Sequence, residues 1–124
     1  MNQHYCTLCL GSNFNRHTRI DQARRALAFH FPNIRFGEEM ETKAIGCGFL
    51  SPFINQLAQF TTALSQEEIR SILKSIEKEN GRLPEDKAQG IVKLDIDLLM
   101  YDDQILKPKD MEKDFIRQGM KAFQ

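Results

Sequence analysis

The fold of this chain is decided by the stretch Lys93–Asp103, which reads KLDIDLLMYDD. Apolar residues alternate with other residues along it, as they do in a β-strand that has one face against a core. The residues expected on the core face are Val92, Leu94, Ile96, Leu98 and Met100. Those expected on the opposite face are Asp95, Asp97, Leu99 and Tyr101. The stretch therefore predicts a strand with two carboxylates on one face.

The pair of aspartates allows two interpretations. In an extended strand the Cα atoms of Asp95 and Asp97 lie about 7 Å apart, close enough for their oxygens to converge on a hard cation. The simpler alternative is that they form the polar half of an amphipathic strand, which is common. However, Asp is a poor strand residue, and like charges on one face repel each other. A bound divalent cation would relieve this repulsion, and magnesium with a polyphosphate is the functional hypothesis.

The length and charge of the chain limit its class. A chain of 124 residues predicts a single domain over 1–124 with one core. Basic and acidic residues balance at 17 each, which gives no general electrostatic case for binding nucleic acid or a membrane surface. No long apolar run is present, and a cytoplasmic location is expected. The three cysteines argue against a disulfide framework, and Cys6 and Cys9 are expected as free thiols on opposite strand faces.

The other segments show further helices and strands. Ser65 and Glu68 have the spacing of a capping box, and Gly81 stands where a left-handed helix stop is expected, which predicts a helix over Gln66–Asn80. The remaining predictions are strands at Tyr5–Leu10, Ile34–Thr42 and Phe53–Leu64, a helix at Thr18–Phe31, a polar loop at Glu85–Gly90, and a final amphipathic helix beyond Pro108 that Asp110 opens.

The order of these elements is β-α-β-β-α-β plus a C-terminal helix. It predicts an α+β fold of the ferredoxin-like type, an antiparallel sheet with helices on one face. The connection Thr42–Pro52 is long for a compact domain, which is typical of functional loops. Asn55 follows it, and a buried amide there either anchors the loop or binds the edge of a planar heterocycle.

Four motifs together resemble one family. They are Leu10–Asn13 after the first strand, Asn55 in Phe53–Asn55, Glu77 followed by Gly81 and Arg82, and the strand Leu94–Tyr101. In order and spacing they resemble the 6-hydroxymethyl-7,8-dihydropterin pyrophosphokinases of folate biosynthesis. That resemblance implies a ferredoxin-like enzyme that transfers pyrophosphate from ATP to the pterin hydroxymethyl group and releases AMP.

The resemblance also implies roles for individual residues. Asp95 and Asp97 are expected to hold two magnesium ions that bridge the ATP phosphates, with Arg82 as a further catalytic residue. The expected nucleotide side consists of Glu77, Arg82 and Lys93. The expected pterin side consists of Thr42, Ile45, Phe53, Asn55 and Phe115. The expected partners are ATP and a dihydropterin.

The chain departs from the family pattern in two places. Where the family has Trp-Gly-Pro-Arg, this chain has Gln89–Val92, with Lys93 as the nearest cation. The segment Asp110–Phe115 lacks the family's histidine and arginine, and the candidates to replace them are Arg117 and Lys121. We therefore expect a short, divergent and slow pyrophosphokinase. The alternative is a weakened or inactive relative that acts as a nucleotide-binding, pterin-binding or protein-interaction module.

Overall fold

Six strands form one antiparallel sheet. The computed structural model describes residues 3–43 and 52–123. Its strands are β1 (His4–Ser12), β2 (Arg35–Phe36), β3 (Met40–Thr42), β4 (Phe53–Thr62), β5 (Asp95–Tyr101) and β6 (Gln104–Ile105). They pair in the order β2-β4-β1-β5-β6, and β3 pairs with β4 beyond the end of β2. The long strands β1, β4 and β5 thus form the centre of the sheet.

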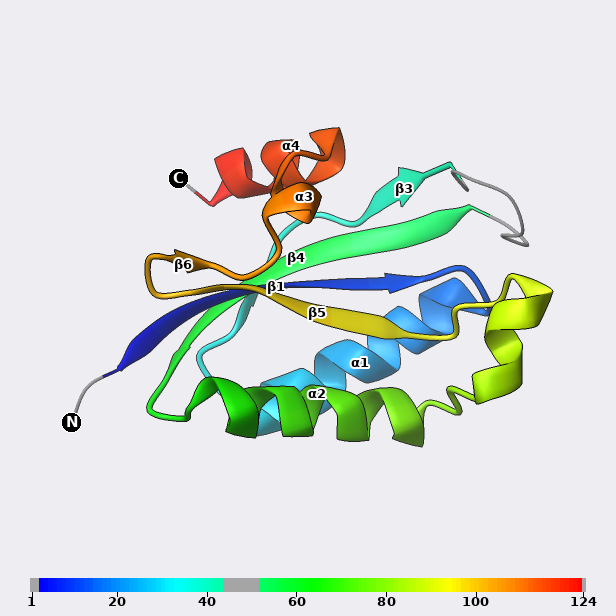
Figure 1. The fold of residues 1–124 in the computed structure, drawn as a ribbon, viewed down its shortest axis with the longest axis horizontal. Helices are drawn as coiled ribbons and strands as arrows, with labels where there is room; N and C mark the ends of the chain where they lie inside the picture. The colour runs from blue at the N-terminus through cyan, green and yellow to red at the C-terminus, as the bar shows by residue number, and fades with distance from the viewer. Residues whose placement is uncertain (1–2, 44–51, 124) are drawn as a thin grey trace.

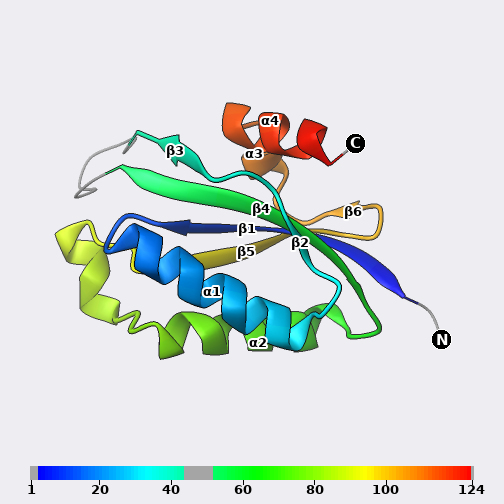
Figure 2. The same cartoon turned by 180° about the vertical axis from the view of Figure 1, so that it is seen from behind.

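Helices lie on both faces of this sheet (Figures 1 and 2). The long helices α1 (Arg16–His30) and α2 (Gln66–Glu79) cover one face, and a 3₁₀ helix, η1 (Pro84–Gln89), connects α2 to β5. The short helices α3 (Pro108–Met111) and α4 (Asp114–Ala122) lie on the other face. This arrangement confirms the predicted α+β fold, with α1 and α2 together on one face. The sequence did not predict that the C-terminal helices lie on the opposite face.

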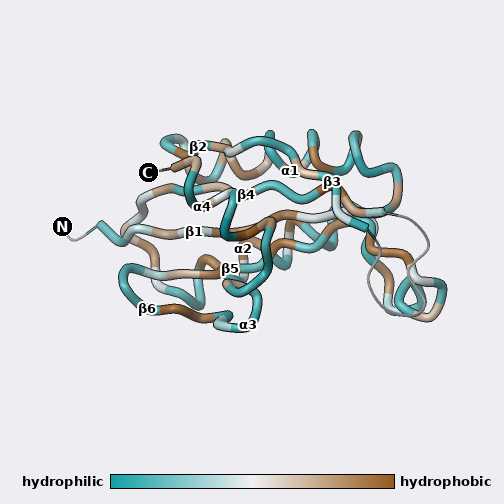
Figure 3. The backbone as a smooth tube through the Cα atoms, turned by 90° about the horizontal axis from the view of Figure 1, so that it is seen from above, coloured by the Kyte–Doolittle hydropathy of each residue, from teal (hydrophilic) through white to brown (hydrophobic). Residues whose placement is uncertain are grey.

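The main core lies between the sheet and the helices α1 and α2. Alternate side chains of the central strands point into it, and the inner faces of both helices supply the rest. Phe31 at the end of α1 stacks on Phe60 of β4 with ring centroids 4.1 Å apart. Seen from the side of α3 and α4, hydrophobic and hydrophilic residues alternate along α1 (Figure 3), as expected of a helix with one buried stripe.

The ends of α2 match the sequence prediction. The Ser65 side chain accepts a hydrogen bond from the Glu68 amide at 3.2 Å, and the Glu68 carboxylate accepts one from the Ser65 amide at 3.0 Å. Gly81 has a φ of 83°, a conformation that glycine adopts without steric cost. Local chemistry alone therefore predicted both ends of this helix to within one residue.

The predicted strand Ile34–Thr42 is divided in the structure. Phe36 pairs with Ala58 and Met40 pairs with Asn55, so this segment advances four residues while β4 advances three. The extra residue interrupts the ladder between β2 and β3, as in a β-bulge. Strict alternation cannot predict such an interruption.

The alternation in β5 holds from Leu94 to Leu99 and then fails. Met100 pairs with Thr7 but Leu98 pairs with Leu8, so Leu99 is an extra residue on β5. After this bulge Tyr101 packs against the main core and Met100 lies on the opposite face, which is the reverse of the prediction. The strand also begins at Asp95 rather than before it.

Several shorter elements differ from the prediction. Helix α1 begins at Arg16, the expected polar loop at Glu85–Gly90 is the helix η1, and the C-terminal helix is split into α3 and α4. The hairpin strand β6 was not predicted, because two exposed residues carry no periodic signal. Within 3–43 and 52–123, no helix has the length and apolar character to span a membrane.

Candidate functional site

The sheet face opposite α1 and α2 is divided into two parts. Helix α4 covers one part, where Leu57, Leu99 and Ile116 form a small buried cluster. Gly119 permits this close packing, because a Cβ atom there would lie 2.9 Å from Leu57 Cγ. The apolar cluster fixes α4 over one half of the face, and the other half remains open to ligands.

The open half contains a cavity of about 760 Å³. It lies where β1 ends and where β4 and β5 begin, beside the segment of α3 and α4. The predicted site residues that line it are Thr42, Phe53, Asn55, Arg82, Asp95, Asp97 and Phe115. The fold thus brings together residues that are up to 73 positions apart in the sequence, from Thr42 to Phe115. A cavity of this size is within the range of small-molecule sites.

The acidic pair lies on strand β5, where its cross-strand partners on β1 are small residues. Asp97 pairs with Cys9, and Asp95 pairs with Gly11, so neither carboxylate has a large neighbour across the ladder. Burial is the main cause that raises the pKa of Asp97 to about 7, and the charge of Asp95 is the second. The two carboxylates therefore repel each other in the ligand-free protein, as the sequence pattern indicated.

Arg82 and Glu77 hold one member of this pair. Arg82 Nη1 lies 3.0 Å from both Glu77 Oε2 and Asp95 Oδ1. Burial lowers the pKa of the Arg82 guanidinium, but the hydrogen bond to Asp95 and the charge of Glu77 outweigh that effect and raise it. Glu77 Oε2 also accepts a hydrogen bond of 2.7 Å from the amide of Ile96, the residue between the two aspartates. Glu77 thus fixes the backbone of the acidic strand.

Asn55 is buried at the other side of the cavity. Its Nδ2 donates to Thr42 Oγ1 at 2.7 Å, which ties the start of β4 to the end of β3. Its Oδ1 lies so close to β1 that a Cβ atom at Gly11 would come within 2.9 Å of it. Asn55 therefore anchors the strand and at the same time lines the cavity. Both interpretations of this amide are compatible with its position.

Two of the predicted site residues, Lys93 and Glu77, do not line the cavity that the described residues form. The Lys93 ammonium donates to the Gly81 carbonyl at 3.0 Å and lies 3.5 Å from Asp86, and Lys93 is not part of the described cavity wall. It stabilises the turn after α2 instead. Ile45 lies outside the described residues. Glu77 supports the site from behind the acidic strand, and it too is absent from the wall that the described residues form.

The cavity also contains residues that sequence analysis did not assign. Cys9 and Gly11 line it, and alternation along β1 could have placed these two residues on one face of that strand. Burial, with the charges of Asp97 and Asp95, raises the pKa of the Cys9 thiol to about 12, which favours the thiol over the nucleophilic thiolate.

Sequence analysis did not assign two basic residues of the described cavity wall, Lys43 and Lys113. By contrast, Arg117 and Lys121 are exposed on α4 and are not among the described residues of that wall. Lys113 immediately precedes α4, and the split of the C-terminal helix gave no signal in the sequence.

The donors on β5 fit a magnesium ion. In the described part of the chain no three His, Cys, Asp or Glu side chains gather around one point. A cation between Asp95 and Asp97 would therefore take its other ligands from water and phosphate. This is the usual coordination of Mg²⁺, which keeps several waters and binds one or two carboxylates.

Comparisons with known proteins assign the chain by sequence. The family model described as 7,8-dihydro-6-hydroxymethylpterin-pyrophosphokinase matches residues 7–124. A search of curated protein sequences gives no match. Among solved structures, the C-terminal domain of the MgtC protein from Mycobacterium tuberculosis matches with 6% identity and a TM-score of 0.42, over 77% of this chain and 86% of that domain.

Proposed function

Because the chain belongs to the 7,8-dihydro-6-hydroxymethylpterin-pyrophosphokinase family, we propose that it transfers pyrophosphate from ATP to 6-hydroxymethyl-7,8-dihydropterin. The observation that carries this proposal is the convergence of the acidic pair and a buried amide on one cavity. A polyphosphate needs charge neutralisation and a pterin needs hydrogen bonds at its edge. The cavity offers both within one space.

Asp95 and Asp97 hold magnesium in this proposal. The ion supplies charge neutralisation for the ATP phosphates when it is bound. The carboxylates contribute its ligands, and their mutual repulsion in the free protein favours that binding. Glu77 keeps the strand in place through its bond to the Ile96 amide. We expect the binding of ATP to depend on a divalent cation for this reason.

The transfer itself needs little covalent chemistry from side chains. The pterin hydroxyl oxygen forms a bond to the β-phosphorus, and the bond from that phosphorus to the bridging oxygen of AMP breaks. The AMP oxygen keeps the electron pair, and the hydroxyl proton passes to water. Arg82 stands beside Asp95, where its guanidinium can stabilise negative charge on the transferred group.

The pterin occupies the part of the cavity near the start of β4. Asn55 and Thr42 supply hydrogen bonds, and the rings of Phe53 and Phe115, which both line the cavity, supply apolar contact. Ile45 remains assigned to this side by the family resemblance.

The predicted rate is low. Val92 lines the cavity ahead of the acidic strand, at the place where the family has an arginine. One well-placed arginine can contribute about 10³–10⁵ to phosphoryl-transfer turnover. We therefore propose that the chain binds its substrates and turns them over slowly.

The test is an assay of AMP release from ATP with magnesium and hydroxymethyl-dihydropterin. The expected result is AMP formation that requires both the pterin and the metal. Omission of the pterin is the control for simple ATP hydrolysis. If AMP does not form with all components present under single-turnover conditions, the proposed activity is wrong.

A further inference from the structure

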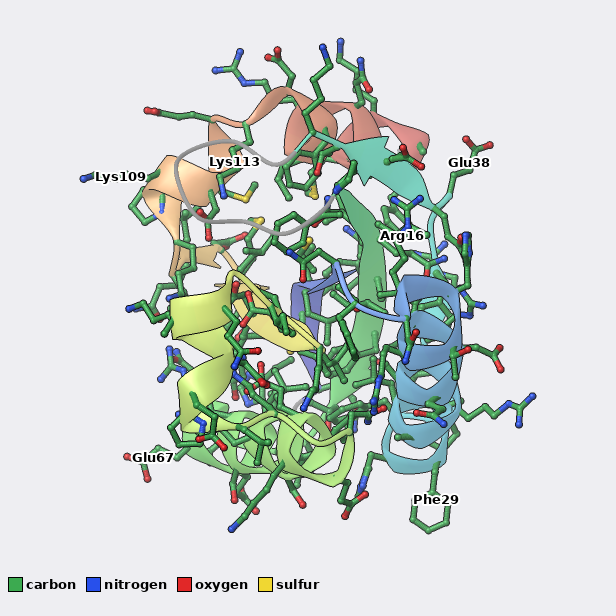
Figure 4. The ribbon with its side chains drawn as sticks, turned by 90° about the vertical axis from the view of Figure 1, so that its right-hand side faces the viewer. Arg16, Phe29, Glu38, Glu67, Lys109 and Lys113 are labelled. Carbon is green, nitrogen blue, oxygen red and sulfur yellow. The ribbon has the colours of Figure 1, made fainter. Side chains whose placement is uncertain are left out.

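Arg16, the first residue of α1, joins this helix to the two segments that carry the proposed pterin side of the cavity. Its Nη2 lies 3.1 Å from Glu41 Oε2 on β3, and its Nη1 donates to the Pro52 carbonyl at 3.3 Å, one residue before β4 begins. In Figure 4 Arg16 lies between α1 and β3. A single guanidinium therefore holds β3 and the approach to β4 together.

The strand β3 is short and lies at an edge of the sheet. Its ladder with β4 extends over three residues. In this ladder Glu41 pairs with Ile54 of the main core, whereas Thr42 pairs with Phe53, which lines the cavity. Because successive residues of a strand point to opposite faces, Glu41 turns toward the helix that carries Arg16 and Thr42 turns toward the cavity.

Thr42 and Asn55 form the hydrogen-bonding pair of the proposed pterin side. Asn55 Nδ2 donates to Thr42 Oγ1 at 2.7 Å, so the orientation of this amide depends on the position of β3 against β4. The contact between Arg16 and Glu41 is one residue away from Thr42. Arg16 itself is not among the described residues that line the cavity. Its effect on a ligand is therefore indirect, through the placement of Thr42 and Asn55.

The start of α1 is an unfavourable place for a basic residue. A positive charge at this end opposes the helix dipole, and the first turn contains no acidic residue. The N-cap residue Asn15 is left-handed, with a φ of 47°, and makes no capping hydrogen bond with its side chain. Residues that conflict with their local structure are expected mainly at functional sites. The two acceptors that Arg16 reaches match the forked donors of a guanidinium, which a lysine does not have.

Arg25 provides a matched comparison on the same helix. Its Nη2 lies 3.1 Å from Asp21 Oδ2, so it pairs within α1, and 81% of its side chain is exposed. For Arg16 the exposed fraction is 27%, and its partners lie outside the helix. Loss of either arginine removes one positive charge and one ion pair near the surface. Only the loss of Arg16 releases β3.

We infer that Arg16 is a positioning residue for the pterin. It holds β3 and the start of β4 so that Thr42 and Asn55 present their hydrogen-bonding groups at a fixed spacing. This inference rests on the proposed function, because it takes a pterin as the ligand at this end of the cavity. A nucleotide bound at Asp95 and Asp97 on β5 does not depend on this contact.

The test compares Arg16→Met with Arg25→Met. Fluorescence titration measures the affinity for 6-hydroxymethyl-7,8-dihydropterin, and calorimetry measures the affinity for a non-hydrolysable ATP analogue with magnesium. Arg16→Met is expected to weaken the pterin about fivefold and to leave the nucleotide unchanged, the size of effect that one ion pair near the surface can have. Arg25→Met is expected to match the wild type in both. Steady-state kinetics should show the same split, as a raised KM for the pterin with an unchanged KM for ATP.

Two further variants test the route through β3. Glu41→Gln is expected to cause part of the loss in pterin affinity, and its addition to Arg16→Met should cause no further loss, because the contact is already absent. Arg16→Lys keeps the charge without the fork and is expected to restore the affinity in part. Thermal melting of each variant checks that the fold is retained.

The outcomes separate this inference from the proposed reaction. If Arg16→Met forms AMP with the KM for the pterin unchanged, the role of Arg16 is wrong and the reaction stands. An equal loss of pterin and nucleotide affinity in Arg16→Met would also overturn the inference, since it would mark a general effect on the fold. A selective loss of pterin affinity in a chain that forms no AMP would support Arg16 and overturn the pyrophosphokinase activity. A wild-type chain that binds no pterin would overturn both.

Discussion

The two faces of the sheet are built in opposite ways. The face toward α1 and α2 is a continuous apolar core in which side chains of the strands pack against side chains of the helices. The face toward α3 and α4 has a small apolar cluster under α4, and beyond it charged and amide groups lie among apolar side chains such as Phe53 and Val92. Because successive residues of one strand point to opposite faces, neighbours in the sequence are expected to serve different purposes. Substitutions at adjacent positions test this comparison.

The largest effect is expected at Asp97, on the cavity face of β5. Asp97→Asn keeps the shape of the side chain and removes a charge that would hold magnesium. AMP formation should fall about 10³-fold or more, because the phosphates lose their neutralisation. A single-turnover assay measures this. Activity within tenfold of the wild type would show that Asp97 does not bind the metal.

The adjacent residue Ile96 tests the core face. Its side chain is 5% exposed and lies in the main core. Ile96→Ala should lower the free energy of unfolding by about 2–5 kcal/mol, the usual cost of such a cavity. Urea denaturation measures the loss. The metal-dependent affinity for ATP of the folded fraction should change little, and a large loss of affinity would contradict the separation of the two faces.

The next smaller effect is expected at Asn55. Asn55→Ala should weaken the binding of a pterin by roughly 1–3 kcal/mol, because a buried hydrogen-bonding partner is lost. Fluorescence titration measures the affinity. The control is Gln56→Ala on the opposite face, whose amide donates to the Gly37 carbonyl at 2.7 Å and should affect stability but not affinity. Equal pterin affinities of wild type and Asn55→Ala would place the pterin elsewhere.

A gain is expected at Val92. Its backbone is held by Asn13, whose Oδ1 accepts from the Val92 amide at 2.6 Å, so a new side chain leaves this bond intact. Val92→Arg should raise the single-turnover rate of AMP formation at least about tenfold, with similar ATP affinity. Val92→Lys is the matched control, since an ammonium lacks the fork of the guanidinium. If the unmodified chain already forms AMP at a rate typical of an efficient kinase, the prediction is wrong.

The smallest effect concerns pH. The pKa of Asp97 is about 7 in the folded protein, chiefly through burial, and 3.8 is its usual value. A raised pKa stabilises the fold while the group is protonated, so this contribution is lost as the pH rises through 7. Without metal, the free energy of unfolding should fall by on the order of 1 kcal/mol from pH 5.5 to 8, after allowance for solvent screening.

The same measurement on Asp97→Asn should show a shallower pH dependence, since this variant has no proton to lose there. Urea denaturation in the presence of a chelator gives both curves. Identical slopes for the two proteins would mean that another group, such as Glu77, whose pKa is also raised by burial, dominates the titration.

Local sequence determined the long elements and the acidic face. Alternation predicted that Asp95 and Asp97 share a face, and the capping box with Gly81 predicted the limits of α2, because these features depend on neighbours in the chain. The sequence also pointed to seven of the seventeen described residues that line the cavity, namely Thr42, Phe53, Asn55, Arg82, Asp95, Asp97 and Phe115. Family resemblance, rather than periodicity, supplied their roles.

Tertiary structure alone decided the rest. The bulge at Leu99 reverses the faces of Met100 and Tyr101, because strand register depends on a partner far away in the sequence. Lys93 turns to Gly81 and Asp86, and Lys113 enters the cavity from the start of α4. The direction of a long charged side chain is set by which oxygens the fold brings within its reach, and those oxygens belong to residues that the sequence does not place side by side.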